Sequence, residues 1–331
     1  MTISAIVPVW NGEELLRRLL ASLGAQTLPA GEWLVVDNGS EDGAPDVARR
    51  SGARVLSMGR NAGFAAAVNR AIREARGEFV AVLNSDVELS PEYLARLAAR
   101  MAETDAWFAT GKIFAAGSDA RIDGTFDAVC RGGTACRVGH GQIDGPAFSS
   151  ERSIGSAPWT AALFRAELFQ RIGGLEESFE SYLEDVDFGL RCAHHGLQGV
   201  YVPEALAWHR GSASLGRWHP ETVRRIARNQ IFLLARHFPN RFLRRRAWTI
   251  LLAQALWGAL ALRHGAGLAW ARGQCQGWRG FSAARHPEQF EFEALDRLLS
   301  QNEILIRESQ AAGVPDWYWR MYFLLSGSGA I

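Results

Sequence analysis

The run FVAVLNSD at residues 79–86 joins five apolar residues to three polar ones. A short apolar run bounded by turn residues is typical of a buried strand. Polar residues that directly follow such a strand lie at its carboxyl end, which is where open α/β sheets bind their ligands. The run therefore predicts a strand over Phe79–Leu83 and a ligand site that begins at Asn84.

The chain on both sides of this run alternates strand-like and helical patterns, which implies βαβ units and a parallel sheet. Further strands are predicted over Ile3–Val9, Trp33–Val36 and Arg54–Ser57, and helices over Glu13–Leu23, Ala44–Gly52, Gly63–Arg76 and Pro91–Met101, the last with Ser90 as its N-cap. Polar clusters at Asn11-Gly12, Asp37–Ser40 and Asn84–Asp86 all follow strands. We therefore expect these clusters to form one shared site.

The second half of the chain mixes both patterns and then becomes helical. Residues 115–155 are rich in glycine and predict loops and short strands. A helix is predicted over Ala161–Gly173, another from Tyr182 to His195, and a strand over Gly199–Pro203. From Thr222 onwards the pattern is mostly helical. We expect an α/β domain over residues 1–220 and a helical region over residues 221–331.

Composition narrows the class of protein. The chain has 331 residues, 21% of them charged, and its formal net charge of +1 argues against a nucleic-acid-binding protein. Four cysteines without a CxxC pair fit a reducing compartment and predict no zinc site. The N-terminus enters a strand at once, and no secretory signal is visible. These observations favour a cytoplasmic protein.

A cluster of carboxylates lies in YLEDVD at residues 182–187, at the start of a predicted helix. Crowded carboxylates repel one another, and in an active site this can poise one of them as a general base. Acidic residues are also favoured in the first turn of any helix, so a purely structural role is the alternative.

Asp86 is placed to bind a divalent metal, because magnesium and manganese prefer carboxylate oxygens and keep positions open for phosphate. Asn84 and Ser85 could then hydrogen-bond phosphate, ribose or metal-bound water. The alternative is an Asn-Ser-Asp turn that caps the next helix. His209 could complete the metal shell as a neutral imidazole, although a lone histidine is more often structural.

Two more polar segments suit a nucleotide ligand. Asp37 could accept hydrogen bonds from a pyrimidine or a ribose hydroxyl, or serve only as part of an Asp-Asn-Gly turn. The segment from Asn61 to Gly63 enters a helix whose N-terminus suits an anion. Asn69 lies inside that helix, where a structural role and a functional one are equally open.

Taken together, these motifs resemble the inverting family 2 glycosyltransferases, and within them the bacterial rhamnosyltransferase-like branch. The likeness covers residues 3–215 and depends on the order and spacing of motifs that are each weak alone. They are IVPVWNG at 6–12, VVDNGSEDG at 35–43, NAGFA at 61–65, LNSD at 83–86, GGLEESF at 173–179, YLEDVD at 182–187 and VPEA at 202–205, ahead of His209.

The resemblance implies an α/β protein with a GT-A fold, which is a Rossmann-like domain with a mixed, mostly parallel sheet, here followed by a helical C-terminal extension. It implies transfer of rhamnose or a similar sugar, with inversion, from a nucleoside-diphosphate donor to a hydroxyl of a cell-surface glycan or a lipid-linked acceptor. The residues implied to contact the donor are Pro8, Val9, Asn11 and Asp37 in the nucleoside pocket, with Asn61, Gly63, Asn84 and Ser85.

The resemblance also implies the catalytic roles. Asp86 becomes a ligand of magnesium or manganese as the last residue of a DxD-type motif, and His209 becomes a further ligand. Asp185 becomes the general base, and Glu184 helps to hold the acceptor or the leaving group. Asn84 replaces the first acidic residue of the motif. Metal use is still expected, while the affinity for the metal is left open.

Two other functions are alternatives to glycosyl transfer. A nucleotidyltransferase on a related fold would be expected to show a glycine-rich loop with a Lys or Arg after the first strand, and PVWN at residues 8–11 has none. A non-catalytic nucleotide-sugar-binding protein would have no need for Asp86, Asp185 and His209 together.

The C-terminal third carries a candidate surface contact. Arg244–Arg246 precedes the uncharged run Ala247–Leu262, which contains two tryptophans and is too short to span a bilayer. One interpretation is an interfacial helix at the inner face of the cell membrane, with the arginines on anionic headgroups. The other is a core helix or the contact of a homodimer. The segment Trp317–Leu325 is similarly amphipathic.

Overall fold

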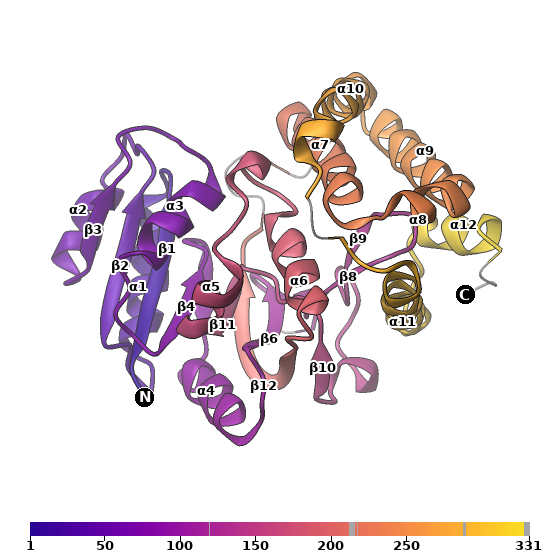
Figure 1. Ribbon diagram of the computed structural model, residues 1–331. Coiled ribbons are helices and arrows are strands. Elements are labelled where there is room, and N and C mark those ends of the chain that lie inside the picture. The colour runs from indigo at the N-terminus through magenta and orange to yellow at the C-terminus, as the bar shows by residue number, and fades with distance from the viewer. Residues whose placement is uncertain (119, 212–215, 217, 287–288, 328–331) are drawn as a thin grey trace. The chain divides into compact units, whose positions relative to one another are not determined.

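The computed structural model describes residues 1–331 except 119, 212–215, 217, 287–288 and 328–331 (Figure 1). The chain divides into two compact units. The first consists of Met1–Phe126 and Gly139–Ser214, and the second of Asp127–Val138 and Leu215–Ile331. The chain therefore leaves the first unit at residue 127 and re-enters it at residue 139.

The first unit is built on one mixed sheet, with the order β10-β12-β6-β11-β4-β1-β2-β3, in which β5 also pairs with β12 and β7 with β6. Its described strands are β1 (Ile3–Val9), β2 (Glu32–Asp37), β3 (Arg54–Ser57), β4 (Phe79–Leu83), β5 (Val87–Leu89), β6 (Phe108–Ala115), β7 (Ile122–Gly124), β10 (Arg152–Ile154), β11 (Ala161–Arg165) and β12 (Gly199–His209). The neighbours β4, β1, β2 and β3 run parallel, and β6 runs parallel to β12. Because β11 is antiparallel to both β4 and β6, these two also point the same way, so their carboxyl ends share one edge.

Helices cover both faces of this sheet. They are α1 (Glu13–Gly24), α2 (Ala44–Arg50), α3 (Phe64–Ile72), α4 (Tyr93–Glu103), α5 (Ala166–Ile172) and α6 (Glu184–His194). Alternate residues of β1, from Ile3 to Val9, join a buried apolar cluster with α1, α2 and α4. On the opposite face the ring of Phe164 meets Phe169 of α5 and Phe188 of α6, so these two helices lie on the other side.

Three sequence predictions are corrected in this unit. Residues 161–165 form strand β11, and only residues 166–172 of the predicted helix are helical. Strand β12 does not stop at Pro203 but continues to His209, after a bulge between Val202 and Leu206. Helix α4 begins at Tyr93 with Glu92 in the N-cap position, so Ser90 is not its N-cap.

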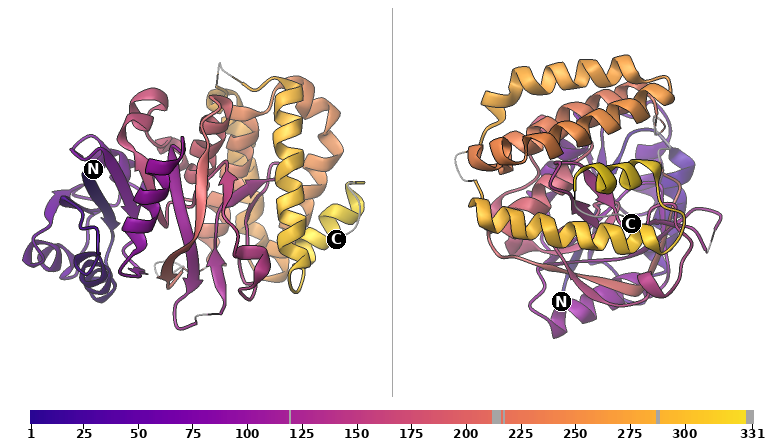
Figure 2. Two further views of the ribbon diagram at one scale, coloured as in Figure 1. Left: turned by 90° about the horizontal axis from the view of Figure 1, so that it is seen from below. Right: turned by 90° about the vertical axis from the view of Figure 1, so that its right-hand side faces the viewer.

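The second unit is helical around a short hairpin. The hairpin pairs β8 (Asp127–Val129) with β9 (Ala135–Arg137), and the helices are α7 (Pro220–His237), α8 (Asn240–Arg245), α9 (Ala247–Arg263), α10 (Gly267–Ala284), α11 (Phe292–Ala311) and α12 (Trp317–Leu325). Helix α10 packs along α7 and α9, and α12 packs against α9 (Figure 2). Glu303 of α11 accepts hydrogen bonds from Arg131 in the hairpin turn and from the hydroxyl of Tyr322, which ties the hairpin to α11 and α12.

The two apolar C-terminal segments form the helices that their patterns predict, α9 and α12. Among the described residues, no helix combines the length and the apolar character needed to cross a membrane.

Candidate active site

Strand pairing brings Asp86 and His209 together. Asp86 directly precedes β5, and β5 pairs with the end of β12, where Val87 lies opposite His209. The backbone N–H of Arg210 also donates to the carbonyl of Asp86, at 3.2 Å. As a result Nε2 of His209 lies 3.2 Å from Oδ1 of Asp86. The two residues that the sequence proposed as metal ligands are therefore neighbours, although 123 positions separate them.

Asp123 is a third member of this cluster and is not among the residues predicted from the sequence. It lies on β7, which pairs with β6 beside the end of β12, and its Oδ2 lies 2.8 Å from Nδ1 of His209. The imidazole thus lies between two carboxylates, those of Asp86 and Asp123. The only signal in the sequence was an aspartate in RIDG at residues 121–124, within a stretch read as loops and short strands.

These contacts set the charge of His209. Burial disfavours the charged imidazole, but the hydrogen bonds with Asp123 and Asp86 and their negative charges outweigh it and raise the pKa of His209 to about 9. At neutral pH the ring is therefore protonated, and each nitrogen donates to a carboxylate. The proton on Nε2 occupies the position that a metal ion would take.

The geometry of this pair fits a divalent metal. Two ligand atoms at about 2.1 Å from one ion and at right angles to each other are about 3 Å apart, close to the 3.2 Å between Asp86 Oδ1 and His209 Nε2. Among the described residues, no three His, Cys, Asp or Glu side chains gather as a complete metal cage. Two protein ligands leave the other positions to water and phosphate oxygens, which suits magnesium or manganese.

The loops after β1 and β2 are bound to each other. Asn11 has φ +60°, its N–H donates to the hydroxyl of Ser40 at 2.9 Å, and its side-chain oxygen accepts from the N–H of Glu41 at 2.9 Å. Asp37 is buried at the end of β2, and its Oδ1 accepts from the N–H of Ser40 at 2.9 Å. Asn11 and Asp37, both proposed from the sequence, thus share Ser40 as a partner.

Four other predicted donor contacts lie at or near the same edge of the sheet. Pro8 and Val9 are buried in β1, and the carbonyl of Val9 accepts from the N–H of Asn38. Asn84 and Ser85 follow β4 and are half-buried, and the N–H of Asn84 donates to Thr160. The side chain of Val9 belongs to the apolar core, so its backbone is the part closest to a polar ligand.

Asn38 is a second residue whose individual role was not predicted from the sequence. Its side-chain oxygen accepts from the N–H of Ala62 at 2.8 Å, and its amide donates to Asn61 Oδ1 at 3.1 Å and to the carbonyl of Gly63 at 3.2 Å. Asn38 therefore connects the end of β2 to the loop that begins α3.

The start of α3 in turn supports the loop before α6. Gly63 has φ +90°, and a Cβ there would lie 2.8 Å from the carbonyl oxygen of Glu180, so only glycine fits. The N–H of Ala65 donates to that same carbonyl at 3.1 Å. Asn69 is buried, donates to the carbonyl of Leu175 at 2.8 Å and accepts from its N–H at 2.8 Å. Asn69 therefore has the structural role that the sequence left open.

The backbone before α6 is strained. Glu180 has φ +60° and ψ −71°, and the N–H of Ser181 bonds to the carbonyl of Phe179 at 2.7 Å, which is a tight γ-turn. Tyr182 and Leu183 follow with φ of +74° and +69°. Non-glycine residues in such conformations are uncommon and cluster at functional sites. This strain and the contacts of α3 set the direction in which α6 begins.

The three carboxylates of α6 have different environments. Asp187 is fully buried and pairs with Arg191 at 3.0 Å, and Arg191 also donates to the carbonyls of Ile172 and Gly174. Asp187 therefore holds the turn that precedes the strained loop. Glu184 is also buried, whereas Asp185 is half-exposed. Of the three carboxylates, Asp185 is the most accessible to a ligand, as a general base must be.

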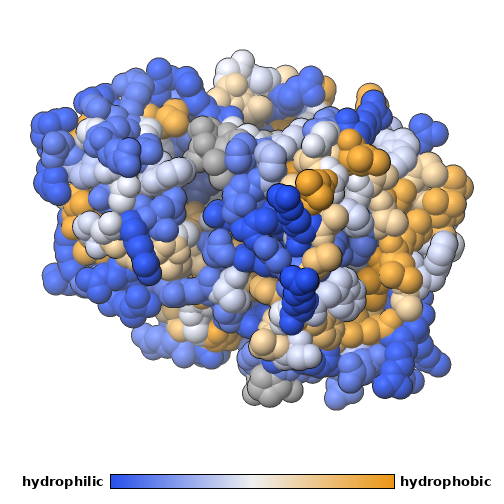
Figure 3. Space-filling view, turned by 90° about the horizontal axis from the view of Figure 1, so that it is seen from above, coloured by the Kyte–Doolittle hydropathy of each residue, from blue (hydrophilic) through white to orange (hydrophobic). Residues whose placement is uncertain are grey.

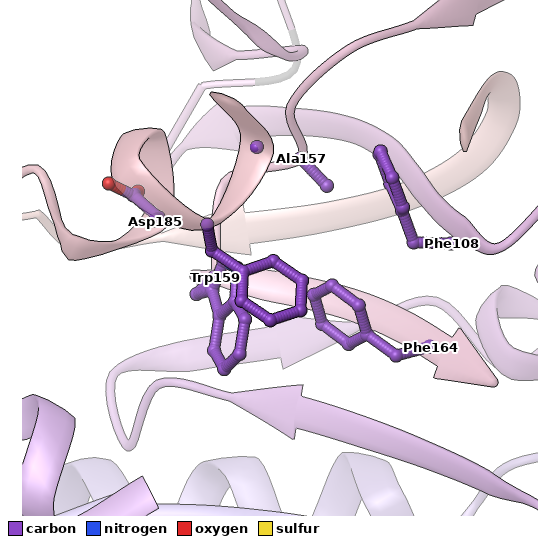
Figure 4. Close-up of a pocket in the computed structure, with 7 residues that line it drawn as sticks. Phe108, Ala157, Trp159, Phe164 and Asp185 are labelled. Atoms are coloured by element: carbon purple, nitrogen blue, oxygen red, sulfur yellow. The ribbon is translucent and has the colours of Figure 1, made fainter. Parts of the chain in front are cut away.

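An aromatic cluster supports the first turn of α6. Trp159, Phe164 and Phe188 lie with ring centroids 4.6–5.9 Å apart. Asp185 lies beside these rings, and its carboxylate points away from them (Figure 4). The rings pack closely and leave no room among them for a nucleotide sugar. The rings therefore hold the helix in place and leave the carboxylate of Asp185 accessible.

Comparison with known proteins identifies the family. The model of the family described as "Glycosyl transferase family 2" matches residues 4–173. An N-acetylglucosaminyl-diphospho-decaprenol L-rhamnosyltransferase of Mycobacterium tuberculosis is 31% identical over 276 residues, which cover 75% of this chain and 87% of that protein.

Two solved structures share the fold. The mannosyltransferase PcManGT from Pyrobaculum calidifontis, in complex with GDP-Man and Mn²⁺, matches with a TM-score of 0.52 at 18% identity, over 98% of this chain and 85% of that one. GalNAc-T7 with UDP, GalNAc and Mn²⁺ matches with a TM-score of 0.61 at 13% identity, over 85% of this chain and 56% of that one. The GT-A fold implied by the sequence motifs is thereby confirmed, with its mixed sheet and C-terminal helices. The chain belongs to glycosyl transferase family 2 and is a glycosyltransferase rather than a nucleotidyltransferase.

Proposed function

We propose that this glycosyltransferase moves rhamnose or a similar sugar from a nucleoside diphosphate to a hydroxyl of a lipid-linked or cell-surface glycan, with inversion at the anomeric carbon. The observation that carries the proposal is the cluster of Asp86, His209 and Asp123 at the carboxyl edge of the sheet. A donor diphosphate carries a high negative charge, and this is the place in the fold where a cation can be held to meet it.

Asp86 Oδ1 and His209 Nε2 would hold magnesium or manganese. Such an ion, when bound, neutralises charge on the departing nucleoside diphosphate. Asp123 accepts from Nδ1–H of His209, which leaves Nε2 as the nitrogen that faces the ion. Asn84 replaces a carboxylate beside Asp86, so it supplies hydrogen bonds to phosphate or metal-bound water rather than charge.

The remaining donor contacts follow from the joined loops. Asp37 and Asn11 would bind the nucleoside together with the backbone of Pro8 and Val9. Both residues bond to Ser40, and Asn11 also accepts from Glu41, so the two loops keep one arrangement. Further donor contacts would come from Asn61, Gly63 and Ser85. Preorganised loops of this kind lower the entropy lost on binding.

Asp185 would be the general base. It takes the proton of the acceptor hydroxyl while that oxygen attacks the anomeric carbon from the face opposite the diphosphate. The bond from that carbon to the diphosphate oxygen breaks in the same step, so configuration inverts. Glu184, buried beside Asp185, would help to position the acceptor or the leaving group.

Two observations support the choice of substrate and location. The Mycobacterium relative is named for rhamnosyl transfer to a sugar on decaprenyl diphosphate, which is a lipid-linked acceptor. The cysteines Cys130, Cys136, Cys192 and Cys275 are all free thiols, which fits the reducing cytoplasm. We therefore propose that the enzyme acts in the cytoplasm, at the inner face of the cell membrane.

The test is a transfer assay with a panel of nucleoside-diphosphate sugars and a short-chain prenyl-diphosphate glycan as acceptor. NMR of the product then gives the anomeric configuration. We expect a rhamnose-type donor to be used, with the configuration inverted relative to the donor. A product with retained configuration would overturn the proposed single displacement, in which the acceptor hydroxyl attacks and Asp185 is the base.

A further inference from the structure

The outer side of α9 is apolar and uncovered by any described part of the second unit. Trp248, Leu251 and Leu262 are 66%, 61% and 71% exposed, and Ala255 and Ala259 between them are exposed as well. Spacings of three and four residues place all five on one stripe of the helix. The opposite side of α9 is buried against the rest of the second unit. Apolar residues therefore lie on both the buried and the exposed side of this helix.

The end of α12 extends this stripe. Leu324 and Leu325 are 60% and 46% exposed, and the indole N–H of Trp248 donates to the carbonyl of Leu325 at 3.4 Å. We call these seven residues, five on α9 and two on α12, the α9 face. A hydrophobic surface gathers in this region of the molecule in the space-filling view (Figure 3). A continuous exposed apolar patch of this kind marks a contact with a protein or a membrane.

The chain segment that contains α9 carries charges of one sign. Residues 222–286, which include α8, α9 and α10, contain twelve arginines and no Asp or Glu. Arg244 and Arg245 precede α9, Arg263 ends it, and all three are exposed. None of the three forms an ion pair with any described residue, whereas Arg246 pairs with Asp296 at 2.7 Å. The predicted basic cluster Arg244–Arg246 is therefore corrected to two available arginines.

We propose that the α9 face lies on a bilayer that contains anionic lipid. The apolar stripe would enter the headgroup boundary, and Arg244, Arg245 and Arg263 would meet lipid phosphates at its two ends. At 17 residues α9 is about 25 Å long, which is less than the hydrocarbon thickness, so it lies along the surface. This inference rests on the proposed location at the inner face of the membrane and names the surface that meets the lipid, while the transfer reaction itself does not depend on it.

Other occupants fit this face less well. A second copy of the chain, packed α9 to α9 about a two-fold axis, would bring the exposed arginines of both copies together and repel. A nucleic acid would match the charge, but the centre of the face carries tryptophan and leucine rather than groups that contact phosphates. A bilayer surface satisfies both the apolar stripe and its basic ends.

The experiment is flotation of the full chain with two kinds of vesicle, phosphatidylcholine alone and phosphatidylcholine mixed with phosphatidylglycerol. We expect the wild type to float with the mixed vesicles at low ionic strength and to be released by salt. The variant carrying Trp248→Ser, Leu251→Ser and Leu262→Ser should bind on the order of tenfold less. Ile304→Ser, at an exposed apolar residue of α11, is the matched control and should bind as the wild type does.

A charge variant keeps the test independent of the apolar substitutions. Arg244→Gln with Arg245→Gln should also lower binding to the mixed vesicles by on the order of tenfold, while Arg246→Gln should change binding much less. Absence of the wild type from the floated fraction at low salt would overturn the proposal. So would equal binding to both kinds of vesicle, or a wild-type dimer in sedimentation that the triple serine variant abolishes. Transfer to a soluble acceptor needs no bilayer, so that assay tests the proposed transfer reaction separately from this contact with lipid.

Discussion

Nδ1 of His209 lies 2.8 Å from Oδ2 of Asp123, across 86 positions of sequence. The contact fixes which ring nitrogen faces Asp86, and so which nitrogen is available to a cation. A metal-binding histidine is commonly held in this way by a carboxylate, and loss of that carboxylate weakens metal binding about 10- to 100-fold. We therefore propose that Asp123 acts as a positioning residue rather than as a ligand.

Asp123→Asn should weaken manganese binding about tenfold or more without removing it. The amide keeps the size of the side chain but can no longer accept with a full charge. Asp86→Ala should weaken manganese binding further, because it deletes a ligand. Titration of manganese followed by electron paramagnetic resonance measures both. An Asp123→Asn protein with wild-type manganese affinity would remove this role.

Manganese binding should release a proton. The pKa of His209 is raised to about 9 without metal, so at neutral pH the ring carries a proton on Nε2 that the ion must displace. Apparent affinity should therefore rise with pH from neutral until about pH 9 and then level off. Calorimetry in buffers of different ionisation enthalpy reports the protons released. No release at neutral pH would mean that the ion does not bind Nε2.

Asp185→Asn should abolish transfer and leave donor affinity nearly unchanged. A general base acts on the acceptor proton in the transition state, and its loss costs on the order of a hundredfold or more in rate. The unfolding temperature should stay close to that of the wild type, because Asp185 is half-exposed. Turnover rate, donor binding and thermal unfolding are the three measurements. Wild-type turnover would exclude Asp185 as the base.

Asp187→Asn is the contrast on the same helix. Asp187 is fully buried and paired with Arg191, so its substitution leaves a buried cation without its counter-charge. Breaking such a pair costs about 3–5 kcal/mol. We expect a clear loss in the free energy of unfolding, measured with urea, whatever happens to the rate. Equal stability of the Asp185→Asn and Asp187→Asn proteins would contradict the division of roles on α6.

Asn69→Ala should loosen the loop that leads into α6. The substitution removes hydrogen bonds to the N–H and carbonyl of Leu175 and to Glu177, and leaves buried backbone groups unpaired. A loss of about 1–3 kcal/mol is expected, with a lower rate of transfer. Arg70→Ala, at an exposed neighbour on α3, is the control and should change little. Hydrogen exchange of residues 173–183 would show whether the loop itself is released.

Short-range hydrophobic patterns in the sequence predicted individual strands correctly. The strands Ile3–Val9, Arg54–Ser57 and Phe79–Leu83 have the predicted bounds, and the amphipathic segment Trp317–Leu325 forms helix α12. Residues 161–165 were assigned to the wrong element because a short apolar run fits a buried strand and a helix equally well. Their pairing with β4 and β6 decides the matter, and those strands lie far away in sequence.

The sequence predicted the motif residues of the candidate site but not the contacts that connect them. Asp86 and His209 were identified by motif, and the structure places them 3.2 Å apart. Asp123 could not be predicted from local sequence, because its contact with His209 depends on the pairing of β7 with β6. The sequence also could not show which carboxylate of α6 is buried, since the pair of Asp187 and Arg191 depends on packing around the Gly173 turn.

Calorimetric titration of the full chain with its nucleoside-diphosphate sugar, with manganese and with chelator, measures whether a cation held by Asp86 and His209 binds the donor. We expect chelator to weaken donor binding about tenfold or more, and His209→Ala to bind donor equally weakly under both conditions. Equal donor affinity of the wild type with manganese and with chelator would contradict this expectation, because Asp86 and His209 would then have no cation to hold.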